Sequence, residues 1–167
     1  MNAPGLIVHA SVVALALDAD GPLFGLALTG PPGAGKSRLA AELIAGCAHR
    51  RSRLLADDAV LIHSREGRLV ASAPPSTSGT IEVFGTGLAR TGHAPPMSVK
   101  AAAALAPEAE RLPPEQSWAP LGPSGPRVPL YKTRGSAAGL VLFLRSVTSG
   151  HSRTAGHDAV PVIPERP

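Results

Sequence analysis

The chain is poor in two residue types that often define small domains, cysteine and the aromatics. Its one cysteine, Cys47, cannot form a disulfide within the chain, and no Cys-x-x-Cys pair is present to hold a metal ion. A single cysteine is typical of a reducing cytoplasm, which is the location we expect. Because aromatic residues make up only 3% of the chain, the core must be built from leucine, valine, isoleucine and alanine.

Long hydrophobic runs and clusters of one charge are also absent. The first apolar stretch is short, is interrupted by His9, and lacks a basic leader and a small-residue cleavage site, so we expect neither a signal peptide nor a membrane span. The 16 basic and 12 acidic residues give a formal charge of +4. Because the basic residues are scattered and are not interleaved with aromatics, we expect no nucleic-acid surface.

Apolar residues make up 44% of the 167 residues, which is enough for one domain with a buried core. Glycine and proline, 18 of each, predict many loops between its elements. We place the domain at residues 1–147. Residues 148–167 show no apolar periodicity, and we expect them to form a disordered tail.

Two apolar segments precede a glycine-rich stretch. Residues 6–17 and 23–29 are predicted strands, and the Asp-Ala-Asp-Gly-Pro sequence between them favours a tight turn, so the strands should form a hairpin. Apolar residues at helical spacing follow the stretch, and a glycine predicts the end of that helix. These residues are Leu39, Ala40, Leu43, Ile44 and Gly46.

The later part of the chain predicts further strands and two ambiguous segments. Strands are expected at 53–63, 67–75 and 79–87. Residues 98–112 are rich in alanine and favour a helix, although a short strand could begin there instead. The apolar segment 135–147 could form either a helix or a strand.

Residues 30–37, with the sequence GPPGAGKS, form a complete phosphate-binding signature. They fit G-x-x-x-x-G-K-[S/T] without mismatch, and they lie between a predicted strand and a predicted helix. An ordinary glycine turn is the alternative, but it does not account for the lysine and the serine. The pattern therefore predicts a loop that binds the phosphates of a nucleoside triphosphate.

Each residue type in this loop has a chemical task. Three glycines let the backbone turn tightly, so that several N–H groups reach the phosphate oxygens together. The start of the helix adds its positive end. Lys36 places a positive charge on the terminal phosphates, and Ser37 offers a hydroxyl to Mg²⁺. The predicted nucleotide-binding residues are Gly30, Pro31, Pro32, Gly33, Ala34, Gly35, Lys36 and Ser37.

Acidic residues further along the chain are candidates for chemistry at the phosphates. Such a site needs carboxylates that hold Mg²⁺ and orient or deprotonate the nucleophile. Asp57 and Asp58 follow the predicted helix, on the next predicted strand. A strand–loop–helix–strand unit would bring them back beside the phosphates, although a turn or a helix cap is the alternative.

Glu82 and His9 each have two interpretations. Glu82 lies in an apolar strand, where a lone charge is costly unless it is paired or binds metal. It is therefore a candidate metal ligand, or else an alternating residue that faces solvent. His9 lies on the first predicted strand, where a hydrogen-bonded core histidine is the common case.

With these residues identified, the chain resembles the catalytic domain of the HPr kinase/phosphorylase family, in the short form that lacks a regulatory N-terminal domain. Four pieces match in order: HASVVAL, GPPGAGKSRLA, LLADDAVLI and SGTIEVFGTG. The corresponding family patterns are a strand led by histidine, a P-loop, a strand ending in Ala-Asp-Asp, and Ile-Glu-Val-Arg-Gly-x-Gly. The resemblance covers residues 8–88.

The resemblance implies an α/β, P-loop NTPase-like fold akin to phosphoenolpyruvate carboxykinase, a mixed sheet with flanking helices. It implies ATP-dependent phosphorylation of a serine in the small phosphocarrier protein HPr, the reverse reaction with phosphate, and a homo-hexamer. Carried over by position, Ser37 and Glu82 would hold Mg²⁺. Asp57 and Asp58, which we do not distinguish at this stage, would supply the base. His9 would be an aspartate partner in the catalytic site with Lys36.

Three positions depart from the family pattern. Its arginine after Ile-Glu-Val is Phe84 here, which removes a cation beside Glu82. The later Pro-Gly-Arg-Asn loop, tied to dephosphorylation, is not found in residues 128–142, and a further family arginine could correspond to Arg111. The kinase direction is therefore better supported than the phosphorylase direction.

Two other functions remain open at the level of sequence. The same loop could serve a small-molecule kinase or another NTPase, with an acceptor pocket in residues 94–147. It could also serve a non-catalytic nucleotide sensor, which the phenylalanine at position 84 favours.

Overall fold

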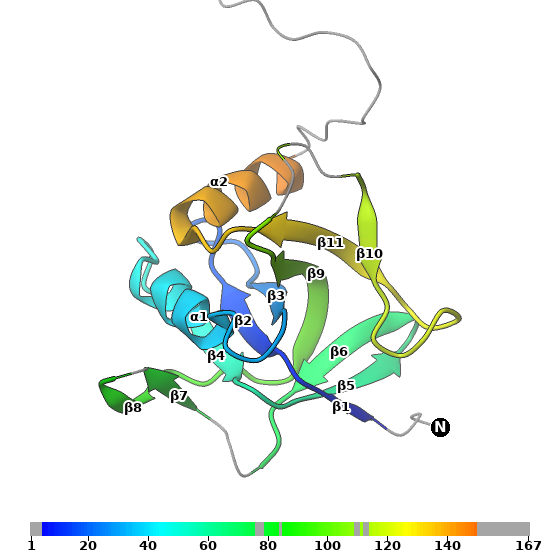
Figure 1. Ribbon diagram of the computed structural model, residues 1–167, viewed down its shortest axis with the longest axis horizontal. Helices are drawn as coiled ribbons and strands as arrows, with labels where there is room; N and C mark the ends of the chain where they lie inside the picture. Colours follow the sequence, from blue (N-terminus) through cyan, green and yellow to red (C-terminus); the bar gives the residue numbers. More distant parts are fainter. Residues whose placement is uncertain (1–4, 76–78, 84, 109–110, 112–113, 150–167) are drawn as a thin grey trace, which may run out of the picture.

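A computed structural model describes residues 5–75, 79–83, 85–108, 111 and 114–149 (Figure 1). Of the expected tail, Thr148 closes the last helix and residues 150–167 lie outside the described part of the chain. The elements in chain order are β1 (Leu6–Val8), β2 (Ser11–Leu15), β3 (Phe24–Thr29), α1 (Lys36–Ala45), β4 (Arg53–Ala56), β5 (Val60–Arg65), β6 (Arg68–Ser72), β7 (Thr80–Val83), β8 (Gly87–Arg90), β9 (Met97–Leu105), β10 (Gln116–Trp118), β11 (Val128–Thr133) and α2 (Ala137–Thr148).

One mixed sheet contains all the described strands except β7 and β8, which form a separate hairpin. Its main order is β1-β5-β6-β9-β3-β2-β4, and β11, paired with β10, joins it along β9. Strand β9 runs parallel to β3 and β11 but antiparallel to β6. The predicted α/β fold with a mixed sheet is confirmed, and so is the hairpin of β2 and β3.

The two faces of the sheet are covered differently. On one face, buried residues of β2, β3 and β9 pack with Leu39 and Leu43 of α1 and with Leu140 and Leu144 of α2. On the other face, the core is formed by strand residues, among them Ile62 of β5. Both helices therefore lie against the same side of the sheet (Figure 1). Every buried apolar side chain of the described residues is aliphatic, as the scarcity of aromatics predicted.

The predicted strand over 6–17 is wrong as a single element, because the chain changes partners within it. Val8 at the end of β1 pairs with Val60 of β5, whereas Ser11 at the start of β2 pairs with Leu28 of β3. The chain must leave one part of the sheet and enter another, and His9 lies at that break. A hydrophobic pattern cannot reveal such a change, because both halves are equally apolar.

The structure also refines three other predictions of secondary structure. The predicted strand over 53–63 is two strands, β4 and β5, separated by the aspartate pair. Of the segment 98–112, residues 98–105 form most of the long strand β9 and not a helix, because tertiary pairing on both edges outweighs the helix propensity of alanine. The ambiguous segment 135–147 lies almost wholly in α2. Neither described helix has the length and apolar character needed to span a membrane.

Candidate active site

The glycine-rich segment joins β3 to α1, as predicted, and its glycines adopt conformations that other residues rarely can. The φ angles of Gly30, Gly33 and Gly35 are 143°, 76° and 95°. Gly35 is the N-cap of α1, and Lys36 is its first residue. Backbone N–H groups at the start of the helix therefore face the loop, where they can meet an anion.

The sheet topology brings other chain segments to the same edge as this loop. Strands β3, β9 and β11 are parallel, so their carboxyl ends meet there. Because β2 is antiparallel to both β3 and β4, the start of β2 and the end of β4 also lie at this edge. Asp57 follows β4 directly, and His9 lies just before β2. This convergence places the two predicted aspartates beside the phosphate-binding loop.

Asp57 links the loop to the sheet through two hydroxyl groups. Its side chain is buried, with the residue only 8% exposed. The Ser37 Oγ donates to Asp57 Oδ1 at 3.0 Å, and the Ser11 Oγ donates to the same oxygen at 2.5 Å. Hydrogen bonds to a carboxylate are stronger than those between neutral groups. They hold this carboxylate against the first turn of α1.

Lys36 is folded back onto its own loop. The residue is 6% exposed, and its ammonium has three acceptors within hydrogen-bond distance. The Nζ donates to Gly30 O and Pro31 O, both at 3.1 Å, and to His9 Nε2 at 2.9 Å. An ammonium has three N–H donors, so all three are satisfied. The charge that would meet phosphate oxygens is held by carbonyl oxygens and an imidazole nitrogen.

His9 connects this lysine to the second aspartate. Its Nδ1 lies 3.0 Å from Asp58 Oδ1 and 3.1 Å from Asp58 O. An ammonium can only donate, so the ring nitrogen facing Lys36 must be the acceptor. The proton of a neutral His9 is therefore assigned to Nδ1, from which it is donated to Asp58.

Asp58 lies at the centre of a strained three-residue turn. Its φ is 67°, and the Ala59 N–H donates to Asp57 O at 2.8 Å across it. A turn of this kind is rare for a residue with a side chain, although aspartate tolerates positive φ better than most. The turn points the two neighbouring carboxylates in different directions, Asp57 toward Ser37 and Asp58 toward His9. Strain of this sort is typical of functional sites.

The structure brings together five of the predicted site residues. They are His9, Lys36, Ser37, Asp57 and Asp58, joined by one continuous chain of contacts with the loop. Ser11 is an additional member that the sequence analysis missed. The one signal for it was a hydroxyl residue within an otherwise apolar strand that follows a histidine.

Glu82 stands apart from this network in the structure. It is exposed on β7, and no described residue forms an ion pair or side-chain hydrogen bond with it. Its role as a metal ligand stays a prediction. Phe84 lies outside the described residues, and Arg111 is exposed.

The residues at the loop fit Mg²⁺ as a partial ligand set. Mg²⁺ prefers oxygen ligands and commonly takes one or two from protein, with water and substrate phosphates supplying the rest. The Ser37 hydroxyl and the Asp57 carboxylate provide two such oxygens 3.0 Å apart. Within the described ranges, no group of three or more His, Cys, Asp or Glu side chains could form a closed metal cage.

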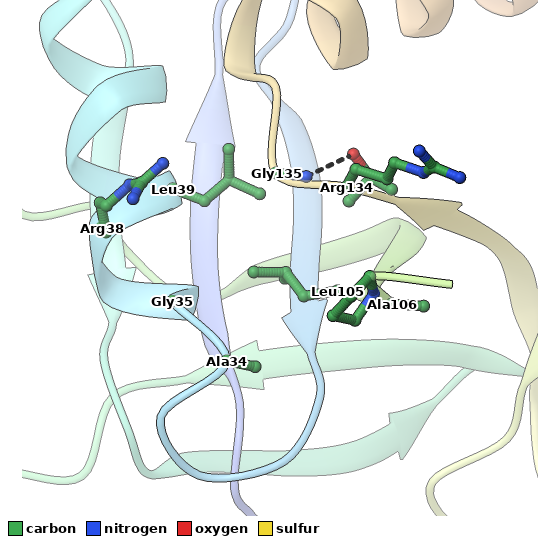
Figure 2. Close-up of a pocket in the computed structure, with 10 residues that line it drawn as sticks. Ala34, Gly35, Arg38, Leu39, Leu105, Ala106, Arg134 and Gly135 are labelled. Atoms are coloured by element: carbon green, nitrogen blue, oxygen red, sulfur yellow. Dashed lines mark hydrogen bonds between the residues drawn. The ribbon is translucent and has the colours of Figure 1, made fainter. Parts of the chain in front are cut away.

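A cavity lies between the loop and the ends of β9 and β11 (Figure 2). Its volume is about 180 Å³, and its walls come from the loop, the first turns of α1 and the ends of β9 and β11. The lining includes Ala34, Gly35, Leu39, Leu105, Arg134 and Gly135. Its walls are distant in the chain, so no local sequence pattern predicts its position.

Two titratable groups away from the loop have displaced pKa values. Burial, and secondarily the charge of Glu115, raises the pKa of Tyr131 on β11. Burial also acts to raise the pKa of Cys47, just after α1, but hydrogen bonds outweigh it and bring the pKa down to about 7. These bonds come from the Ser52 side chain and from the backbone of Ser52, Arg51 and His49.

We expect the Cys47 thiol to be alkylated readily at neutral pH. Thiolate is the reactive form, so a pKa lowered from 9.0 to about 7 moves the midpoint of reactivity down by the same amount. The rate of reaction with iodoacetamide, followed by mass spectrometry, should be half-maximal near pH 7 in the folded protein. In urea the midpoint should return toward 9.0. Equal midpoints in the two states would contradict the prediction.

The fold and the site together define an α/β protein with a P-loop sequence between β3 and α1 and two aspartates beside it. Residues 7–92 match the family of HPr serine kinase C-terminal domains, and the chain belongs to this family. Its fold is of the α/β type that the resemblance implied, with a mixed sheet and flanking helices.

Individual relatives agree with this assignment. The HPr kinase/phosphorylase of Clostridium tetani is 50% identical over 64 residues, and that of Clostridium acetobutylicum is 48% identical over the same length. Each match covers 38% of this chain and 20% of the relative. The solved HPr(Ser) kinase/phosphatase of Coxiella burnetii superposes with a TM-score of 0.65 at 22% identity, covering 87% of this chain and 95% of that one. The chain thus matches a fifth of the length of these curated relatives but nearly all of the solved domain.

Proposed function

We propose that the protein is an ATP-dependent kinase that phosphorylates a serine of the phosphocarrier protein HPr, in the regulation of carbohydrate metabolism. The observation that carries this proposal is the hydrogen bond from Ser37 to Asp57, which places a buried carboxylate against the phosphate-binding loop. Family membership supports the choice of acceptor. The names of the curated relatives support it too.

The loop would bind the triphosphate through backbone N–H groups at its glycines and at the start of α1. Lys36 would exchange the carbonyl oxygens of Gly30 and Pro31 for oxygens of the terminal phosphates. The carbonyls would then regain water, while the ammonium would neutralise the charge on the transferring group. Such electrostatic stabilisation is the main source of rate in phosphoryl transfer.

The aspartate pair would accept the proton of the acceptor serine. As its oxygen forms a bond to the γ-phosphorus, the bond from that phosphorus to the β–γ bridging oxygen breaks, and ADP leaves. Asp57 is held at the loop by Ser37, and Asp58 is held by His9. His9 is a positioning residue here, because its contacts are to Lys36 and Asp58.

Mg²⁺ would be held by Ser37 and Asp57, with Glu82 as the further ligand that the resemblance implies. When bound, it would supply positive charge that offsets the negative charge of the phosphates. We also propose the reducing cytoplasm as the compartment, the domain boundary near residue 147, and a homo-hexamer. The kinase direction is favoured over phosphorolysis, because the Pro-Gly-Arg-Asn sequence is absent from residues 128–142.

Phosphotransfer to HPr is the direct test. The protein is incubated with Mg²⁺, γ-labelled ATP and purified HPr, and the labelled species are separated by electrophoresis. We expect label on HPr, no label on HPr whose acceptor serine is replaced by alanine, and slow loss of label when phosphate is added. In a parallel reaction, a cell extract replaces HPr, and label on one of its small molecules would instead indicate a metabolite kinase. Nucleotide binding without turnover would indicate a sensor.

A further inference from the structure

A second cavity lies at the opposite end of β9 and β11 from the phosphate-binding loop. Its volume is about 250 Å³, and its walls come from the starts of β6, β9 and β11. On β9, its wall includes Lys100, whereas Leu105 at the other end of the strand lines the cavity beside the loop. At about 3.3 Å per residue, these two positions are roughly 17 Å apart along the strand. The second cavity is therefore outside the active site.

This cavity exists because two strands share one edge of β9 and then separate. Strand β6 pairs with β9 at Met97 and Ser98, whereas β11 pairs with it from Ala102 to Leu105. Strand β3 occupies the other edge. Between the two pairings, residues 99–101 have no strand partner on the shared edge among the described residues. An unpaired edge presents backbone N–H and C=O groups for hydrogen bonding.

A β-bulge places Lys100 at this gap. Gly25 of β3 pairs with Val99, and the next residue of β3 pairs with Ala101. Lys100 is therefore an extra residue on β9. The two cores record the shift, because Val99 belongs to one and Ala101 to the other, although residues two apart on a regular strand share a face. Gly25 permits the close approach of the strands, since a Cβ there would collide with the Ser98 carbonyl oxygen. Bulges commonly re-aim a side chain at a functional site.

Three cations line the cavity, and none of its lining residues is acidic. They are Arg68, Lys100 and Arg127. In the part of the chain that the structure describes, neither Arg68 nor Lys100 has a side-chain hydrogen bond or an ion pair. Arg127 donates to Pro123 O at 2.6 Å, which uses one of the five N–H donors of a guanidinium. Glu66 lies in the turn before β6 but is not part of the wall. A cleft lined by charges of one sign concentrates the opposite ion.

Between the cations, the cavity has a small apolar floor. Leu69 and Val99 are buried core residues, and Pro126 and Pro129 add further apolar surface. A bound anion can therefore include a carbon skeleton as well as its charged groups. Sites that enclose a drug-sized ligand usually measure about 300–1,000 Å³. The cavity is smaller than that, so it suits a compact molecule.

We propose that this cavity binds a small organic anion that carries at least two negative charges on phosphate or carboxylate groups. Arg68, Lys100 and Arg127 are its partners. Arginine pairs with either group through two parallel hydrogen bonds, and lysine acts as a point charge. The inference does not depend on the proposed function, because the cavity lies at the other end of β9 from the loop. Without such an anion, these three side chains should have no part in the reaction at the loop.

Removal of two charges, followed by titration calorimetry at low salt, tests the site. The probes are citrate, which has carboxylates, and pyrophosphate, which has phosphates. We expect Arg68→Gln/Lys100→Gln to bind both at least about tenfold more weakly than the unmodified protein does. The control, Arg90→Gln/Lys132→Gln, removes the same charges from exposed positions outside the cavity, and its affinities should stay within about twofold. The loop is unchanged in both variants, so only the difference between them is assigned to the cavity.

A second measurement locates the anion in the unmodified protein and needs no variant that folds. Phenylglyoxal modifies free arginine side chains, and peptide mass spectrometry identifies them. Citrate or pyrophosphate should protect Arg68 and Arg127 but not the exposed Arg90. Protection by one probe alone would identify the group that is recognised. Equal affinities of the two folded double variants, or no protection by either probe, would overturn the proposal. Protection by a polyglutamate peptide but by neither small anion would also overturn it, because the cavity would then belong to a surface for an acidic protein.

Discussion

Replacing Lys36 by alanine should lower the rate of phosphotransfer to HPr by about 10²–10³-fold, the usual cost of removing one group that stabilises charge in a transition state. Lys36 is the cation at the phosphate-binding loop whose ammonium is already surrounded by acceptors there. Without it, the charge on the transferring phosphoryl group loses its point-charge partner. Steady-state rates with saturating ATP and HPr give the measurement, and calorimetry gives the accompanying loss of ATP affinity.

Lys100→Ala is the matched control for this variant. Lys100 is an exposed residue of β9 and makes no contact with the loop. Its substitution should leave rate and affinity unchanged. Because the Lys36 ammonium also bridges His9 and two loop carbonyls, thermal unfolding of Lys36→Ala must be followed to show that the fold persists. A folded Lys36→Ala protein with normal turnover would mean that the loop does not carry the chemistry.

Local sequence patterns sufficed for the loop and its flanking elements. The strand before Gly30 and the helix after Lys36 both depend on residues close in the chain, and glycine is required where φ is positive. The hairpin of β2 and β3 was predictable for the same reason, since a five-residue turn sequence joins two apolar segments. The end of α1 at Gly46 belongs to the same class.

The composition of the active site could be predicted from the sequence in part, and the role of His9 only with the help of the family resemblance. His9 and Asp58 are 49 residues apart, and their contact depends on the long-range pairing of β2 with β4. The residues on both sides of Asp57–Ala59 are apolar, and their pattern predicts one strand. The positive φ of Asp58 that divides it into two strands does not depend on hydrophobicity, so the pattern could not reveal the turn. The residue pattern identified the two aspartates, the resemblance added His9 to the site, and the structure supplied their separate partners.

Long-range pairing explains what could not be predicted. Strand β9 has an alanine-rich sequence that favours a helix in isolation, yet it lies between two parallel neighbours where small side chains pack closely. The cavity beside the loop exists only because the end of this strand lies next to the end of β11. No local window of sequence contains that information.

The second large effect concerns the two neighbouring aspartates, which the sequence did not distinguish. Asp57→Asn should lower the rate of phosphotransfer by about 10²–10⁴-fold, the range for loss of a group that handles the proton in a transition state. Asp57 is buried and bonded to Ser37, so its charge lies nearest to the bound phosphates. The amide oxygen of asparagine can still accept from Ser11 and Ser37. Stability should therefore change by no more than about 1 kcal/mol.

Asp58→Asn should behave differently, because Asp58 is 78% exposed and its carboxylate contacts His9 instead of the loop. Loss of its charge should reduce the rate less than Asp57→Asn does. His9→Asn should show a similar reduction, since one variant removes the charge from the His9–Asp58 contact and the other removes its imidazole. Asp20→Asn, in the exposed turn before β3, is the charge-matched control and should have normal activity. Rates for all four variants, measured with the same HPr preparation, decide the assignment. A larger loss in Asp58→Asn than in Asp57→Asn would show that the exposed carboxylate is the one that accepts the proton, with Asp57 serving the metal and the loop.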